Sequence, residues 1–214
     1  MAMNPSTDQE KQTFTDFLRK IFKGVLESIA GFLNRLGIKP VVVTAFGLVG
    51  NLVAGVLIAF GFLFWGGLLA MIIWPLDALD GTLARMRNES SKYGSFVDSV
   101  TDRYSEIAIF LGLLLYFIRE NSALNIVLVF LAVVGGLLVS YVRAKAESLN
   151  YSSKIGLLTR AERYIILIPG LLFKIPTVAL WFLAILTHVT AIQRFWNVRK
   201  QAKSDMSREL RGGK

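Results

Sequence analysis

The sequence predicts an all-α integral membrane protein with six transmembrane helices, preceded by an interfacial amphipathic helix. The composition is the first reason: 54% of the 214 residues are hydrophobic, and the mean hydropathy of +0.53 exceeds what the core of a soluble domain requires. The second reason is that apolar runs recur at lengths suited to crossing about 30 Å of hydrocarbon. The third is the placement of charge, because the basic residues behind the net charge of +9 lie between these runs. This placement favours anionic lipids and phosphorylated substrates as partners over nucleic acid.

The N-terminal region is predicted to lie on the membrane and not across it. Residues 1–12 are polar and are expected to form a disordered tail. Over residues 13–37 apolar side chains recur at helical spacing on one face. The opposite face carries charged residues, namely Arg19, Lys20, Lys23, Glu27 and Arg35. A helix with one apolar and one charged face is typical of the membrane interface.

Six apolar segments follow and make up one predicted domain over residues 38–200. They cover residues 43–63, 66–86, 95–118, 123–145, 161–173 and 176–196, of which the fifth is short. Residues 201–214 are predicted to be a polar tail. Nearly all Lys and Arg lie in the N-terminal stretch, the turn at 85–94, the stretch at 143–163 and the tail from Arg194. By the positive-inside rule, both termini and the charged site are cytoplasmic, so we expect a multi-pass protein of the cell (cytoplasmic) membrane.

Four aspartates stand where a spanning helix avoids charge. Asp77 and Asp80 lie near the end of the second segment, three residues apart, and Asp98 and Asp102 lie near the start of the third, four residues apart. Each pair therefore shares one face of its helix, and the turn between the segments brings the faces together. Carboxylates that converge at one depth repel each other unless a cation lies between them. The sequence has no cysteine, so its oxygen ligands favour Mg²⁺ or Mn²⁺ over zinc.

These aspartates belong to a longer pattern, Asp77-x2-Asp80-Gly81-x2-Ala84-Arg85-x8-Gly94-x3-Asp98-x3-Asp102. The pattern resembles the signature of the CDP-alcohol phosphatidyltransferase family at all eight positions. The resemblance implies a homodimeric six-helix enzyme that displaces CMP from a CDP-linked lipid with an alcohol. It implies that Asp77, Asp80 and Asp98 hold metal, with Asp102 as catalytic base and further metal ligand, although the residues alone leave open which aspartate is the base. It also implies a CDP-lipid site that includes Thr44, Gly81, Ala84, Arg85 and Gly94.

A second, basic region is predicted to bind the phosphate of the acceptor alcohol. Its candidates come from the ends of three segments on the predicted cytoplasmic side: Ser140, Arg143, Lys145, Arg163 and Arg194. Several cations suit a phosphorylated acceptor, whereas a neutral alcohol does not need them. The runs at 140–147 and 160–163 resemble those of the phosphatidylinositol phosphate synthases within the family, although Ala161 stands where a proline is expected and Arg143 and Lys145 exchange the usual order of the basic pair. The resemblance implies CDP-diacylglycerol as donor and inositol 1-phosphate as acceptor.

Three alternatives remain open at this point. Glycerol 3-phosphate would bring a phosphate to the same cations, which would make the chain a phosphatidylglycerophosphate synthase. An ether-lipid donor would make it an archaetidylinositol phosphate synthase. Carboxylates within a membrane also mark ion pathways, so a cation transporter or channel is a third hypothesis. The clustering of charge on one side of the membrane disfavours a pathway through it.

Overall fold

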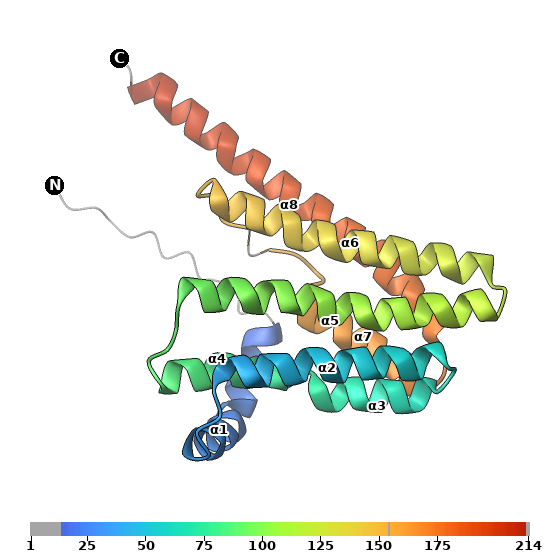
Figure 1. Cartoon of the computed structure of the whole chain (residues 1–214). Helices are drawn as coiled ribbons and strands as arrows, with labels where there is room; N and C mark the ends of the chain where they lie inside the picture. Colours follow the sequence, from blue (N-terminus) through green and yellow to red (C-terminus); the bar gives the residue numbers. More distant parts are fainter. Residues whose placement is uncertain (1–13, 154, 213–214) are drawn as a thin grey trace.

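The computed structural model describes residues 14–153 and 155–212, and within these residues it contains eight α-helices and no strand (Figure 1). The helices are α1 (Phe14–Arg35), α2 (Pro40–Ala59), α3 (Leu63–Ile73), α4 (Leu76–Met86), α5 (Lys92–Arg119), α6 (Ala123–Ser148), α7 (Arg160–Leu172) and α8 (Pro176–Gly212). The all-helical prediction is confirmed for this part of the chain.

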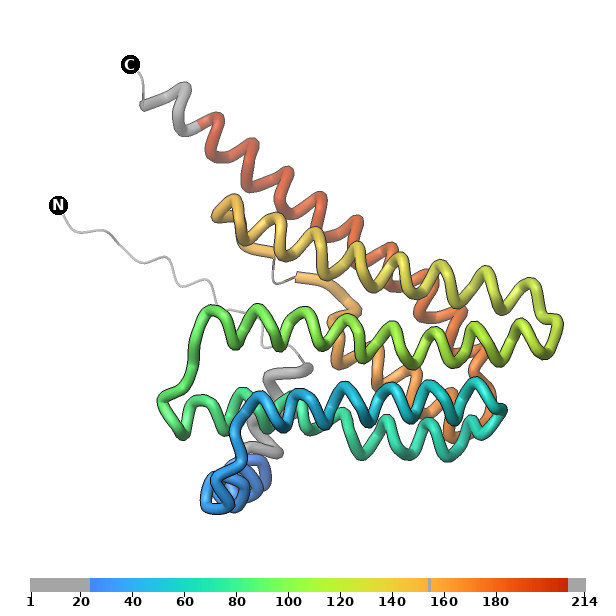
Figure 2. Tube along the Cα trace, in the orientation of Figure 1, coloured from blue at the N-terminus to red at the C-terminus, as the bar shows by residue number. Residues whose placement is uncertain are grey.

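The long helices α2 and α5 pack along each other and carry the charged site at one end. They approach closely because Gly55 of α2 lies against the backbone of Ala108 and Gly112 of α5, where a Cβ atom would collide with a carbonyl group. Around this pair, α3 packs on α2 and on α7, and α6 packs on α8 (Figure 2). One apolar core joins all six helices, so the core fixes where the ends of the helices lie relative to one another.

The predicted second segment, 66–86, consists of two helices in sequence. α3 ends at Ile73 and α4 begins at Leu76, with Trp74 and Pro75 between them. Pro75 has no N–H group for a hydrogen bond to α3, and its backbone (φ −64°) is suited to the entry of a new helix. The aspartates of the second segment therefore lie on a short helix of their own.

Four stretches of the described residues are long and apolar enough to cross a membrane: Pro40–Ala59, Leu63–Met86, Ala123–Ser148 and Pro176–Ser207. The predicted third and fifth spans do not meet the same criteria of length, hydropathy and low charge. α5 has 28 residues but carries Asp102, Arg103 and Glu106 along its length, and α7 has 13 residues. The chain thus has the helices of a multi-pass membrane protein, with four candidate spans.

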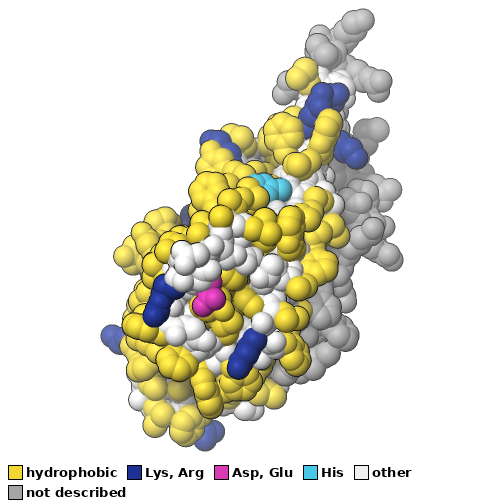
Figure 3. Space-filling view, turned by 90° about the vertical axis from the view of Figure 1, so that its right-hand side faces the viewer, with side chains coloured by type: hydrophobic (Ala, Val, Ile, Leu, Met, Phe, Trp, Pro, Cys, Tyr) yellow, Lys and Arg dark blue, Asp and Glu magenta, His cyan; other side chains and the backbone are white. Residues whose placement is uncertain are grey.

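The outward faces of these helices are strongly apolar. Phe46 and Val53 of α2, Phe130 of α6 and Phe182 of α8 are between 47% and 68% exposed. The face at the right-hand end of Figure 1 is dominated by hydrophobic side chains, with only a few Lys or Arg among them (Figure 3). Apolar surface of this extent is unfavourable in water and favourable in lipid.

α1 covers most of the predicted interfacial helix at 13–37, and it is apolar on two sides. Leu26, Ala30 and Leu33 join a small core with residues of α2 and α4. The exposed apolar side chains of α1 and the turn after it are Val25, Ile29, Phe32 and Leu36. The predicted tail at 1–12 lies outside the described residues.

α8 continues far beyond the predicted end of the sixth segment at residue 196. It is one helix of 37 residues from Pro176 to Gly212. The sequence after Trp196 contains no Pro and reaches no Gly before Gly212, so nothing in it interrupts a helix. The predicted polar tail is therefore helical as far as Gly212.

Candidate functional site

The turn between α4 and α5 brings the two pairs of aspartates to one end of the bundle. The chain reverses over residues 87–91, where Asn88 has a positive φ of 55°. Ser91 caps α5, because its Oγ accepts a hydrogen bond from the N–H group of Gly94 (2.9 Å). This end, at the left of Figure 1, also holds the C-terminal parts of α6 and α8. The turns that join α2 to α3, α5 to α6 and α7 to α8 lie at the other end.

A groove of about 480 Å³ lies between the start of α2, α4 and the start of α5. Its lining includes every residue predicted for the CDP-lipid site together with two of the aspartates: Thr44, Asp80, Gly81, Ala84, Arg85, Gly94 and Asp98. The structure thus gathers these residues around one space.

Asp80 is held in place by the helix opposite it. The Oγ1 of Thr44 donates a hydrogen bond of 2.6 Å to Oδ2 of Asp80, which is only 5% exposed. A carboxylate buried to this extent needs such a donor. Beside it, Gly81 and Ala84 present little bulk to the groove, and the exposed Arg85 donates a hydrogen bond to Thr82 (3.0 Å).

The other two aspartates are joined by an arginine that the sequence analysis did not select. Nη1 of Arg160, the first residue of α7, lies 2.7 Å from Oδ2 of Asp77 and 2.5 Å from Oδ1 of Asp102. The two carboxylates offset the cost of burying the charged guanidinium of Arg160. The four aspartates therefore divide into a groove pair, Asp80 and Asp98, and an Arg160-bound pair, Asp77 and Asp102.

The donor chemistry of the aspartates fits a hard divalent cation, since all four offer carboxylate oxygens. Two of them already converge on one positively charged nitrogen, that of Arg160. Among the side chains that the structure describes, no three acidic, His or Cys groups are arranged as a metal site. Asp77 and Asp102 are thus placed to neutralise a cation, and in this structure the cation is a guanidinium.

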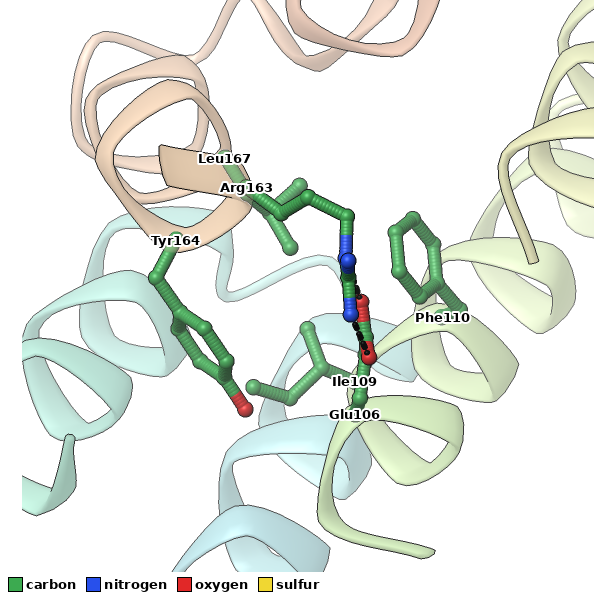
Figure 4. Close-up of a pocket in the computed structure, with 6 residues that line it drawn as sticks. All are labelled: Glu106, Ile109, Phe110, Arg163, Tyr164 and Leu167. Atoms are coloured by element: carbon green, nitrogen blue, oxygen red, sulfur yellow. Dashed lines mark hydrogen bonds and ion pairs between the residues drawn. The ribbon is translucent and has the colours of Figure 1, made fainter. Parts of the chain in front are cut away.

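The predicted acceptor residue Arg163 points into the bundle. Its guanidinium forms a two-pronged ion pair with Glu106 of α5, with Nε 2.5 Å from Oε1 and Nη2 2.7 Å from Oε2 (Figure 4). Arg163 is 3% exposed and packs among Ile109, Phe110 and Leu167. Its Nη1 has no hydrogen-bond partner among the described residues, so one edge of the guanidinium remains available.

Arg194 of α8 is also buried, at 2% exposure, and it binds backbone. It donates to the carbonyl oxygens of Val139 in α6 (2.7 Å) and Ile155 in the loop before α7 (2.9 Å). Arg143 is half exposed and pairs with Glu147 (2.8 Å). Three of the predicted acceptor cations, Arg143, Arg163 and Arg194, therefore each have a partner within the protein already.

The remaining two candidates lie on the same stretch of α6, where Ser140 is half-buried and Lys145 is exposed. No contact of either side chain with the three arginines is recorded within the described residues. Their part in acceptor binding stays a prediction.

Arg160 lies in a run that the sequence analysis had already noted, three residues before Arg163. Both arginines fall on neighbouring faces of one helix turn, and the sequence does not say which of them meets the aspartates. That choice depends on how α7 is rotated against α5.

Residues 38–200 match the sequence model of the family described as CDP-alcohol phosphatidyltransferase. The chain belongs to this family and is an enzyme of this class.

Similar proteins come from both bacteria and archaea. The phosphatidylinositol phosphate synthase of Streptomyces avermitilis is 34% identical over 90% of this chain and 85% of its own length. That of Cutibacterium acnes is 37% identical over 84% and 95%. The archaetidylinositol phosphate synthase of Pyrococcus horikoshii is 35% identical over 86% and 96%.

Two solved structures of one mycobacterial enzyme have a similar fold. The crystal structure of Mycobacterium tuberculosis phosphatidylinositol phosphate synthase with CDP-DAG bound has a TM-score of 0.74 and 29% identity, and covers 81% of this chain and 93% of that one. The structure of the same enzyme in complex with manganese and citrate has the same TM-score and identity, and covers 81% and 88%.

Proposed function

We propose that this enzyme joins inositol 1-phosphate to CDP-diacylglycerol and produces phosphatidylinositol phosphate and CMP. The observation that carries the proposal is the groove, where the five residues predicted for the CDP-lipid site surround Asp80 and Asp98. A solved structure with CDP-DAG bound shares this fold. The choice of inositol 1-phosphate as acceptor is supported by the relatives named phosphatidylinositol phosphate synthase.

In the proposed reaction, the acceptor hydroxyl oxygen forms a bond to the phosphorus that carries the diacylglycerol. The bond between this phosphorus and the oxygen of CMP breaks, and CMP leaves. Asp102 takes the hydroxyl proton, which is the role of a general base. Of the two aspartates on α5, Asp102 is the one that contacts α7, through Arg160, and α7 also carries the proposed acceptor cation Arg163.

The metal in the proposal is Mg²⁺ or Mn²⁺, held by Asp77, Asp80, Asp98 and Asp102. When bound, it neutralises the pyrophosphate and stabilises the charge on the departing CMP. Manganese is present in a solved structure of similar fold, which supports the choice of metal. Thr44 orients the carboxylate of Asp80 by its hydrogen bond.

The acceptor phosphate is proposed to bind beside Arg143, Arg163 and Arg194, with Ser140 and Lys145 nearby on α6. Guanidinium groups favour a dianion, and within the described residues Nη1 of Arg163 has no hydrogen-bond partner and can donate to it. The relative from Pyrococcus horikoshii supports an ether-lipid donor as the second candidate, with the same acceptor.

In the membrane, we propose that α2, the α3–α4 pair, α5, α6, α7 and α8 are six spans. α1 would lie in the interface with its exposed apolar side chains toward lipid. The positive-inside rule supports a cytoplasmic site and cytoplasmic termini. α5 packs on α2 and α6, α7 packs on α3 and α8, and Asp102 and Glu106 of α5 pair with arginines of α7, which supports charged residues within these two helices. The homodimer implied by the family resemblance stays a prediction.

The experiment is CMP release by the purified full-length protein with Mg²⁺ and CDP-diacylglycerol. Inositol 1-phosphate, glycerol 3-phosphate, free inositol and serine are compared as acceptors, and a CDP-linked ether lipid is compared as donor. We expect release with inositol 1-phosphate only. Release with glycerol 3-phosphate alone would instead identify a phosphatidylglycerophosphate synthase.

A further inference from the structure

We infer that Arg160 is a resident counter-ion of the aspartates, which holds Asp77 and Asp102 together from α7 and must release them when a divalent cation binds. The inference rests on the metal site of the proposed function and concerns how that site is regulated. Arg160 contacts the aspartates and not the reacting atoms, so its role is that of a positioning residue.

The first observation is that one nitrogen serves two carboxylates on different helices. Nη1 of Arg160 lies within ion-pair distance of Asp77 on α4 and of Asp102 on α5. A single positive centre between two carboxylates does what a bound metal ion would do, which is to offset their repulsion. Arg160 and a cation would therefore compete for the same oxygens.

The second observation is that the base of Arg160 is firmly held. The loop before α7 is anchored to α8 by hydrogen bonds from Arg194 to the Ile155 carbonyl (2.9 Å) and from the Leu158 N–H group to Thr190 Oγ1 (3.1 Å). These bonds hold the backbone just before Arg160, and α7 itself packs on α3 and α8. Release of the aspartates therefore requires rotation of the Arg160 side chain and not movement of α7.

The third observation is that Arg160 is only partly satisfied where it lies. Its Nε and Nη2 are buried and have no hydrogen-bond partner within the described residues. Unpaired buried N–H groups cost free energy, so the guanidinium of Arg160 is held less strongly here than it would be with all its N–H groups paired. The ring of Tyr164, 5.5 Å from the Arg160 Cζ atom, offers a face on which the released guanidinium can remain.

Binding of Mn²⁺ to the detergent-solubilised full-length protein tests the inference without a turnover assay. Free Mn²⁺ is measured by its electron paramagnetic resonance signal for the wild type, Arg160→Gln, Arg160→Lys and the control Arg103→Gln. Arg103 lies 3.7 Å from Asp102, forms no ion pair with another aspartate among the described residues, and has a side chain that is 35% exposed. We expect Arg160→Gln to bind Mn²⁺ about tenfold more tightly than the wild type. The reason is that the guanidinium of Arg160 and Mn²⁺ compete for the carboxylates of Asp77 and Asp102, so removing one strengthens binding of the other. Arg160→Lys should be intermediate, and Arg103→Gln should stay within about twofold of the wild type.

Thermal unfolding provides the second measurement, which also reports whether the variants fold. With EDTA, Arg160→Gln should unfold at a lower temperature than the wild type, because Asp77 and Asp102 then repel each other. Addition of Mn²⁺ should raise its unfolding temperature by more than that of the wild type. If Arg160→Gln fails to fold, the Arg160→Lys variant carries the same comparison.

The outcomes separate the inference from the proposed function. A wild type that binds Mn²⁺, with Arg160 variants that bind it equally or more weakly, overturns the counter-ion role and leaves the metal site standing. A wild type that binds no Mn²⁺ overturns the metal site, and the inference with it.

Discussion

Asp98 and Arg85 in the groove beside α4 are held in the opposite way to Arg163 and Arg194 in the basic region between α6, α7 and α8. In the groove, Asp98 and Arg85 line an open space, and Arg85 donates one hydrogen bond, to Thr82. In the basic region, Arg163 and Arg194 are buried and already bonded, to Glu106 and to two backbone carbonyl groups. The first arrangement leaves groups ready for a ligand, whereas the second uses most of their bonds to hold the helices together.

This difference shows that arginine can serve in two ways in one protein: Arg85 faces an open groove, whereas Arg163 and Arg194 hold helices together. A cation that also clamps the fold cannot be removed without a cost in stability, whereas an exposed groove residue such as Arg85 can. Substitutions in the two regions should therefore differ in the ratio of lost activity to lost stability.

The largest effect is expected from the aspartates. Asp98→Asn and Asp102→Asn should each lower the rate of CMP release by about 10³-fold or more, because each removes a proposed metal ligand and Asp102 is also the proposed base. Both variants should elute as folded protein in size-exclusion chromatography. Asp205→Asn, at an exposed position of α8, is the matched control and should keep wild-type activity. Full activity in either site variant would show that the site is assigned wrongly.

The next largest effect is expected in stability, from the ion pair in the basic region. Glu106→Gln should lower the free energy of unfolding by about 3–5 kcal/mol, because Arg163 is left as a buried charge without its partner. Chemical unfolding in mild detergent measures this loss, with the exposed Glu89→Gln as control. An unchanged stability would mean that the Arg163 side chain finds another partner and is not a clamp.

A smaller effect is expected from the hydroxyl that orients Asp80. Thr44→Val removes a hydrogen bond to a buried carboxylate, which is worth about 1.5–3 kcal/mol, and should raise the KM for CDP-diacylglycerol by about tenfold. The KM for the acceptor should not change. Thr177→Val, at the opposite end of the bundle, serves as control. A change confined to the acceptor KM would contradict the assignment of Thr44 to the groove.

The smallest effect is expected from the exposed arginine of the basic region. Arg143→Gln should raise the KM for inositol 1-phosphate by about three- to tenfold, with little loss of stability, because its ion pair with Glu147 is half exposed. Steady-state kinetics with each substrate varied in turn measure this. Arg119→Gln, at the other end of α5, should change neither KM. Equal increases in both KM values would indicate a general charge effect.

Much of the groove follows from the sequence, because its residues are close together in the chain. The spacing of Asp77 with Asp80 and of Asp98 with Asp102 places each pair on one helix face, whatever the rest of the fold. The short turn with Asn88 and Ser91 then leaves little freedom in how α4 and α5 face each other. The assignment of Gly81, Ala84 and Gly94 to one site came from the family resemblance, and in the structure the three residues line one groove.

The sequence by itself also determined the helical class and the end of the bundle where charge gathers, since both follow from local composition. Only the tertiary structure decided that Arg160 meets Asp77 and Asp102 while Arg163 meets Glu106. These partners are distant in the chain, and their pairing depends on the rotation of α7 against α5, which the packing of the whole core sets. Periodicity indicates which face of a helix is apolar, but Arg160 and Arg163 lie three residues apart on almost the same face, so it does not tell which arginine meets which carboxylate.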